Sequence, residues 1–92
     1  EVVAGLEIGT ALRYKMRQDW CTGKLRKLDG HRTLELFTLE LLPALGRELE
    51  LSVTRPSGRG EETFRLLGQV VEAVPVPGNR DRGGRFRVLI DS

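Results

Sequence analysis

The chain has 92 residues, of which 39% are hydrophobic and 30% are charged, a composition typical of one small soluble globular domain. Its formal net charge of +2 is too small to indicate nucleic-acid binding by itself. The single cysteine, Cys21, excludes an internal disulfide and a cysteine-based zinc site, and no apolar run or signal-peptide pattern indicates a transmembrane segment. We expect one cytoplasmic domain, residues 1–92, excised from a longer chain because it begins at Glu1 rather than methionine.

The first strand pattern lies at residues 12–17, where apolar and basic side chains alternate. A β-strand places alternate side chains on opposite faces, so one set faces a core and the other faces solvent. The expected inward set is Leu12, Tyr14 and Met16, and the outward set is Arg13, Lys15 and Arg17. Residues 18–20 predict a hairpin connection. Trp20 is expected to plug one end of a barrel rather than to offer a stacking surface to a base.

The segment at residues 21–28 predicts a second strand, with a bulge near Arg26 or Lys27 because its alternation slips. Asp29 and Gly30 form the strongest hairpin signal in the chain, with His31 and Arg32 at its exit. The next segment, 33–42, fits either a helix face or a strand. Its β-branched and aromatic residues, followed by Pro43, favour a strand through Phe37 and then an irregular stretch to Gly46.

The second half of the chain predicts three more strands. Residues 47–54 alternate cleanly, residues 55–62 have the glycine, proline and charge content of an exposed loop, and residues 63–74 form one long strand. Gly68 in that strand indicates a bulge, a bend or a close backbone approach. A second loop is predicted at 75–84 and a last strand at 85–90. The expected inward residues are Leu49, Leu51, Val53, Phe64, Leu66, Gly68, Val70, Val74, Phe86, Val88 and Ile90.

These elements add up to six short strands with hairpin-length or modest connections and no helical crossover. Such a chain predicts an antiparallel sheet. Inward alternation on every strand is typical of a small closed or split barrel. The predicted fold class is therefore all-β, a small six-stranded antiparallel β-barrel.

No combination of side chains indicates catalysis. The chain has one histidine and one cysteine, and no nucleophile stands beside a plausible base. His31, beside a predicted turn, is expected to be an exposed loop residue. Ligand spacing for a metal and a glycine-rich phosphate loop are also lacking. We therefore expect a protein that is not an enzyme and that carries no cofactor.

Basic residues form three groups: Arg13, Lys15 and Arg17; Lys24, Arg26, Lys27 and Arg32; and Arg80, Arg82, Arg85 and Arg87. The first two groups lie on predicted neighbouring strands and could form one patch. Such a patch could hold a phosphorylated ligand, an acidic protein surface or RNA. The three phenylalanines, Phe37, Phe64 and Phe86, fall at expected core positions. Because nucleic-acid surfaces normally interleave exposed aromatic rings with cations, this placement counts against RNA.

Four stretches of the chain resemble the PilZ domain, a bacterial receptor module for cyclic di-GMP. They are Gly23-Lys-Leu-Arg-Lys-Leu-Asp-Gly, Leu42-Pro-Ala-Leu-Gly-Arg-Glu-Leu-Glu-Leu, Leu67-Gly-Gln-Val-Val and Gly84-Arg-Phe-Arg-Val-Leu-Ile. The resemblance covers about three quarters of the chain and implies a six-stranded barrel. The stretch Leu6-Glu-Ile-Gly-Thr, followed by a basic strand, is also similar to the split-barrel domain that precedes PilZ in flagellar brake proteins.

The resemblance is weaker at the ligand motifs. PilZ domains bind their dinucleotide with Arg-x-x-x-Arg ahead of the first strand and Asp/Asn-x-Ser-x-x-Gly after the second. Arg13-Tyr-Lys-Met-Arg17 has the first spacing but lies within a predicted strand. Asp29-Gly-His-Arg-Thr-Leu lacks the serine and the final glycine. The helix that usually follows the barrel is missing. The chain thus resembles a divergent PilZ domain with degenerate nucleotide motifs.

The resemblance implies a bacterial signalling or interaction module that acts by contact with a protein partner or an adjacent domain. Cyclic di-GMP is expected to bind weakly or not at all. The residues proposed to contact it are Arg13, Lys15, Arg17, Asp29, His31 and Arg32. The alternative is a small β-barrel that binds RNA or DNA through a basic face.

Overall fold

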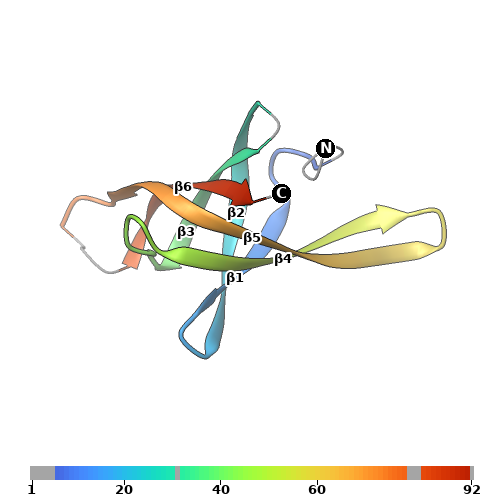
Figure 1. Ribbon diagram of the computed structural model, residues 1–92, viewed down its shortest axis with the longest axis horizontal. Coiled ribbons are helices and arrows are strands. Elements are labelled where there is room, and N and C mark those ends of the chain that lie inside the picture. Colours follow the sequence, from blue (N-terminus) through green and yellow to red (C-terminus); the bar gives the residue numbers. More distant parts are fainter. Residues whose placement is uncertain (1–5, 31, 79–81, 92) are drawn as a thin grey trace.

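The computed structural model describes residues 6–30, 32–78 and 82–91, which form six antiparallel strands and contain no helix (Figure 1). The strands are β1 (Ala11–Met16), β2 (Asp19–Asp29), β3 (Thr33–Leu41), β4 (Glu48–Ser57), β5 (Gly60–Pro75) and β6 (Arg82–Asp91). They close into a barrel in the order β1-β2-β3-β6-β5-β4. The predicted fold class is confirmed. Two residues named in the predictions above, His31 and Arg80, lie outside the described residues.

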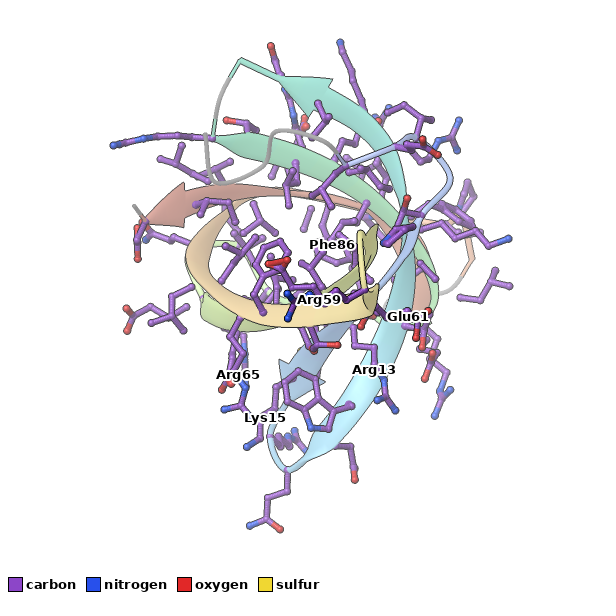
Figure 2. The ribbon with its side chains drawn as sticks, turned by 90° about the vertical axis from the view of Figure 1, so that its right-hand side faces the viewer. Arg13, Lys15, Arg59, Glu61, Arg65 and Phe86 are labelled. Carbon is purple, nitrogen blue, oxygen red and sulfur yellow. The ribbon has the colours of Figure 1, made fainter. Side chains whose placement is uncertain are left out.

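The core is made by the alternation that the sequence predicts. Leu12 and Tyr14 on β1 are fully buried, as is Phe86 on β6. Tyr14 and Phe86 meet edge to face, with ring centroids 5.0 Å apart, which is a preferred geometry for aromatic pairs. Figure 2 shows Phe86 inside the ring of strands, while Arg13, Lys15 and Arg65 point away from it. The barrel interior is therefore filled with side chains, and interaction with other molecules falls to its outside.

A hydrogen-bond network fastens β1, β2 and β3 together inside the barrel. The Tyr14 hydroxyl lies 2.8 Å from Thr38 Oγ1 and also contacts the Leu41 carbonyl. Thr38 Oγ1 donates to the Thr22 carbonyl at 2.9 Å and accepts from the Glu40 N–H at 3.0 Å. Burial in this site raises the pKa of Tyr14 well above its usual range, and the neighbouring Cys21 and Glu40 raise it further.

The segment predicted as an exposed loop, residues 55–62, is instead part of a two-stranded arm. β4 and β5 stay paired through Thr54–Thr63 and on to Ser57–Gly60, with a turn at Gly58 and Arg59. The arm projects beyond the barrel (Figure 1) and the molecule measures 43 Å along its long axis against 23 Å across. An exposed ribbon has solvent on both faces and needs no apolar alternation, so its sequence looks like a loop.

Two further differences from the predictions concern strand length and register. β3 continues to Leu41 rather than ending at Phe37, and the pairing of β3 with β6 is irregular between Thr38 and Leu41. The expected bulge in β2 is confirmed between Leu25 and Lys27. β5 has its bulge between Val70 and Glu72 rather than at Gly68, and this bulge shifts the register of the strand. Because a shift of one residue exchanges the two faces of a strand, Val74 is 38% exposed rather than inward, and Ala73 packs against the core.

Candidate functional site

Arg17 and Asp29, two of the residues proposed to contact a nucleotide, lie at opposite ends of the barrel, with Arg13 and Lys15 between them. Arg13 and Lys15 stand on the outer face of β1, and Arg17 is in the β1–β2 turn with a left-handed φ of 60° rather than on the strand. Asp29 and Arg32 flank the β2–β3 turn. The two turns are separated by the eleven residues of β2, roughly 33 Å of extended chain, and Figure 1 shows them pointing in opposite directions. The basic groups on β1 and β2 do lie on neighbouring strands, but Arg17 and Arg32, at the two ends of β2, are too far apart to contact one small ligand.

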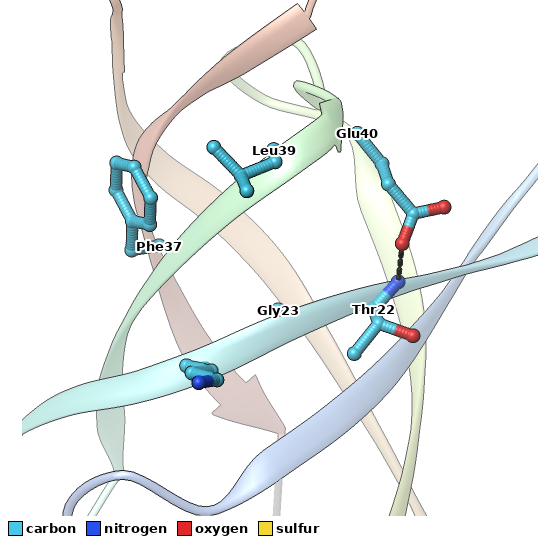
Figure 3. A pocket seen from close by; sticks show the side chains of 6 residues that line it. Thr22, Gly23, Phe37, Leu39 and Glu40 are labelled. Atoms are coloured by element: carbon cyan, nitrogen blue, oxygen red, sulfur yellow. Dashed lines mark hydrogen bonds between the residues drawn. The ribbon is translucent and has the colours of Figure 1, made fainter.

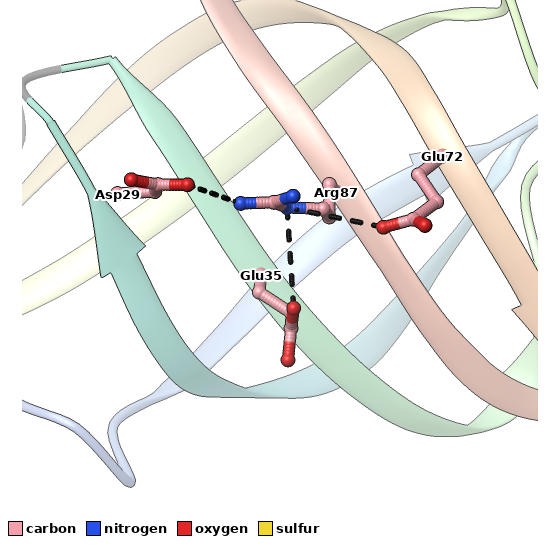
Figure 4. A network of polar contacts seen from close by, with 4 residues as sticks. All are labelled: Asp29, Glu35, Glu72 and Arg87. Atoms are coloured by element: carbon pink, nitrogen blue, oxygen red, sulfur yellow. Dashed lines mark hydrogen bonds and ion pairs between the residues drawn. The ribbon is translucent and has the colours of Figure 1, made fainter.

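Asp29 is already engaged by a cation from a distant part of the sequence. Arg87 on β6 lies between three carboxylates, and its guanidinium hydrogen-bonds to Asp29 (Figure 4). Its Nε is 3.9 Å from Glu35 Oε1 and 3.9 Å from Glu72 Oε1. With three acids around one guanidinium, this cluster carries excess negative charge and offers no free arginine to a phosphate. Asp29 and Arg87 act as a structural tie between β2 and β6.

Phe37 lies on the outer face of β3, not in the core as predicted. Leu34 and Leu36 are fully buried, so alternation along the continued strand turns Phe37 outward, where it is half-buried. Its cross-strand neighbours are both basic: Lys24 on β2 and Arg85 on β6. The Arg26 guanidinium also lies over the ring, 5.8 Å from its centroid. Three cations thus surround one outward aromatic ring.

Two shallow hollows adjoin Phe37. One, of about 470 Å³, is lined by Thr22, Gly23, Lys24, Phe37, Leu39 and Glu40 (Figure 3). The other, of about 400 Å³, is lined by Ile8, Gly9, Lys24, Leu25, Arg26 and Phe37. Leu39 is 76% exposed, and Glu40 Oε2 accepts the Thr22 N–H at 2.7 Å. The outer face of β2 and β3 is therefore hollowed beside Phe37, with apolar and basic side chains in its lining, as at many ligand-binding surfaces.

Trp20 is also outward, and the expectation that it plugs a barrel end is wrong. Cys21 is buried, so its neighbour Trp20 faces the outside of β2, where it is half-buried. Trp20 pairs across strands with Lys15, whose Nζ lies 5.8 Å from the ring centroid. The predicted basic row of β1 is thereby placed beside an aromatic ring.

A second outward surface is aliphatic. Leu67 and Val71 on β5 are 60% and 43% exposed, and Leu89 on β6 is 40% exposed. Leu67 pairs with Asp91 and Leu89 pairs with Gln69, so the two leucines are diagonal neighbours on one face of the sheet. Leu67, Val71 and Leu89 are called the aliphatic face below. Outward aliphatic side chains that are contiguous on neighbouring strands often mark an interaction surface.

Within the described residues, no group of three or more histidine, cysteine, aspartate or glutamate side chains could hold a metal ion. The same part of the chain contains no helix long and apolar enough to cross a membrane. Cys21 is a buried free thiol. The chain matches no family model, no curated protein and no solved structure. Function must therefore be argued from the barrel surface itself.

Proposed function

We propose that the chain is a non-catalytic, PilZ-like signalling module that binds a partner protein through the aliphatic face of β5 and β6. The observation that carries this proposal is the exposure of Leu67, Val71 and Leu89 on neighbouring strands. In water, the outer face of an antiparallel sheet is normally polar, and each outward leucine or valine leaves apolar area in solvent. Covering that area with a partner supplies the driving force for association.

The surroundings of the aliphatic face indicate the chemistry of the partner. Leu67 lies between Asp91 on β6 and Glu50 on β4, and Glu48 is exposed further along β4. Arg65 forms an ion pair with Glu50, with 3.0 Å between Arg65 Nη1 and Glu50 Oε2, and neutralises its charge. The remaining rim is acidic. A complementary partner has an aliphatic centre bordered by lysine or arginine, because opposite charges at the rim favour encounter and exclude wrong partners.

Cross-linking in the source cell tests this proposal. A photo-reactive amino acid at position 67 is expected to form an adduct with one discrete protein, and the same group at Thr63, which is exposed in the arm of β5, is the matched control. The protein identified in the adduct, once purified, should bind the wild-type chain and lose at least about tenfold in affinity to Leu67→Asp, because a charge would be buried at the interface. Equal adducts at positions 67 and 63, or unchanged binding by Leu67→Asp, would contradict the proposal.

The same proposal predicts that cyclic di-GMP binds weakly, with a dissociation constant above the micromolar range. Arg13 pairs with Thr22, seven residues along β2 from Asp29, and Arg17 lies beyond the other end of β2, so this arginine pair and the aspartate do not converge on one ligand. Asp29 is also engaged by Arg87. Calorimetric titration measures this directly, with Arg13→Ala as the informative variant. A sub-micromolar affinity that Arg13→Ala abolishes would show that the arginine motif is functional and the degenerate interpretation wrong.

A further inference from the structure

Two aromatic rings stand on the outside of adjacent strands, and each has a cation within reach of its ring. Lys15 Nζ is 5.8 Å from the Trp20 centroid, and Arg26 is 5.8 Å from the Phe37 centroid. These two rings are two of the five aromatic side chains in the chain. Their outward placement removes the sequence-based objection to nucleic acid, which assumed that no phenylalanine is exposed.

The cations between the two rings complete a continuous track. Lys24 pairs with Phe37, and Arg13 pairs with Thr22, which lies between Lys24 and Trp20 along β2. Lys15 pairs with Trp20 at the far end. Lys24, the cross-strand partner of Phe37, is four residues from Trp20 along β2, or about 13 Å in an extended strand. The Trp20 and Phe37 rings are therefore separated by a distance that a few residues of an extended polymer can span. We call this row the β1–β3 track, formed by Arg13, Lys15, Trp20, Lys24, Arg26 and Phe37.

We propose that the β1–β3 track binds single-stranded nucleic acid. Bases stack on Phe37 and Trp20, and the backbone phosphates between them contact Lys24, Arg13 and Lys15. Stacking on an aromatic ring needs an unpaired base, since the bases of a duplex are already stacked on each other. Cations interleaved with the rings match a polymer that carries one phosphate per base. The proposal uses strands different from those of the aliphatic face and does not depend on the protein partner.

Substitution of Glu40 is expected to change the affinity of the track for an oligonucleotide. Its carboxylate lies beside the track, held by the Thr22 N–H at 2.7 Å, and repels a passing phosphate. Glu40→Gln keeps an oxygen that can accept the same hydrogen bond and removes the charge. The variant is therefore expected to bind an oligonucleotide a few-fold more tightly than the wild-type chain.

The test is titration with oligothymidylate and oligouridylate at several salt concentrations. Trp20 is the only tryptophan, so its fluorescence should be quenched as a base stacks on it. Phe37→Leu keeps an apolar side chain at this position but removes the aromatic ring. The variant should bind the oligonucleotides about tenfold more weakly. Lys24→Ala should lower the slope of log affinity against log salt by about 0.7, the contribution of one phosphate contact on a single strand. Arg59→Ala, which removes a positive charge from the β4–β5 turn at the end of the arm, is the matched control and should leave the slope unchanged.

The outcomes separate this inference from the proposed function. Binding to single strands but not to duplex, with the variant effects above, supports the track. Absence of quenching at low salt, equal affinity for duplex, or equal loss with Arg59→Ala and Lys24→Ala overturns it. If the oligonucleotides do not bind while the position 67 adduct forms, the nucleic-acid inference is wrong and the protein-binding proposal is supported. Melting temperatures of all variants, measured alongside, show that each loss of binding occurs in a folded chain.

Discussion

Gly68→Ala is expected to destabilise the barrel by about 3 kcal/mol, a large fraction of the roughly 5–15 kcal/mol that stabilises a typical domain. A Cβ at this position would lie 2.6 Å from Val88 Cγ1 and 2.7 Å from the Leu89 carbonyl oxygen. The second contact is with backbone, which cannot rotate away as a side chain can. β5 and β6 would have to separate where they pair as Gly68 and Ile90.

The physical cause is steric, not conformational. Gly68 does not have a left-handed φ, so alanine adopts its backbone without strain, and in open space the substitution would even stabilise slightly by restricting the unfolded chain. Gly58→Ala in the β4–β5 turn is the matched control, since a Cβ there meets nothing within 4 Å. Thermal unfolding should show a melting temperature lower by about 15 °C for Gly68→Ala and little change for Gly58→Ala. A melting temperature for Gly68→Ala equal to that of wild type would mean that the close approach of β5 to β6 is wrong.

Local alternation was enough to predict most of the barrel. Strands β1 and β4 each have one apolar and one polar face, β6 departs from this only at the outward Leu89, and the pattern depends only on the period of two in an extended chain. The β2 bulge was also predictable, because Leu25 and Leu28 are both apolar but three residues apart. The β5 bulge was not, because Val70, Val71, Ala73 and Val74 are all apolar and either register keeps an apolar residue inward.

Of the candidate site, only the basic residues could be predicted from the sequence. Arg13, Lys15, Lys24 and Arg26 are recognisable in the sequence as outward basic residues, but their aromatic neighbours are set by pairing between strands. Lys24 meets Phe37, thirteen positions away, and that register depends on the β2 bulge. Asp29 meets Arg87 across 58 positions, so its loss as a ligand-binding group could not be seen from the local motif. Long-range register decides which charges are neutralised and which remain open to a ligand.

The two outward surfaces have opposite character, and this follows from which strands carry them. β1, β2 and β3 present rings and cations, whereas β5 and β6 present the leucines and valine of the aliphatic face and the adjoining β4 presents glutamate. A formal net charge of only +2 conceals this difference because it averages over the whole surface, whereas the outward cations Arg13, Lys15, Lys24 and Arg26 lie together on β1 and β2. Local potential rather than net charge determines which partner approaches each side. The nucleic acid and the basic-rimmed protein proposed above would therefore contact different strands of the barrel.

Above pH 10, the wild-type chain is expected to lose stability by about 1.4 kcal/mol per pH unit through Tyr14 alone. Burial disfavours the phenolate, so the pKa of Tyr14 in the folded chain lies above the value near 10 that applies when the chain is unfolded. The contribution to stability is complete below pH 10 and is lost as the pH rises toward the folded-state pKa, because the unfolded chain releases its proton first. Tyr14 is the only tyrosine, so no second phenol obscures the effect.

Tyr14→Phe isolates this group. At pH 7, the variant should be less stable by about 1–2 kcal/mol, because Thr38 and the Leu41 carbonyl lose their contact with the hydroxyl. The difference should shrink above pH 10 and reverse near pH 11–12, where the phenolate of the unfolded wild-type chain outweighs the lost hydrogen bonds. Urea unfolding of both chains across this range measures the crossing. Two stability curves that stay parallel above pH 10 would show that the hydroxyl is not buried in the network that joins β1 to β3.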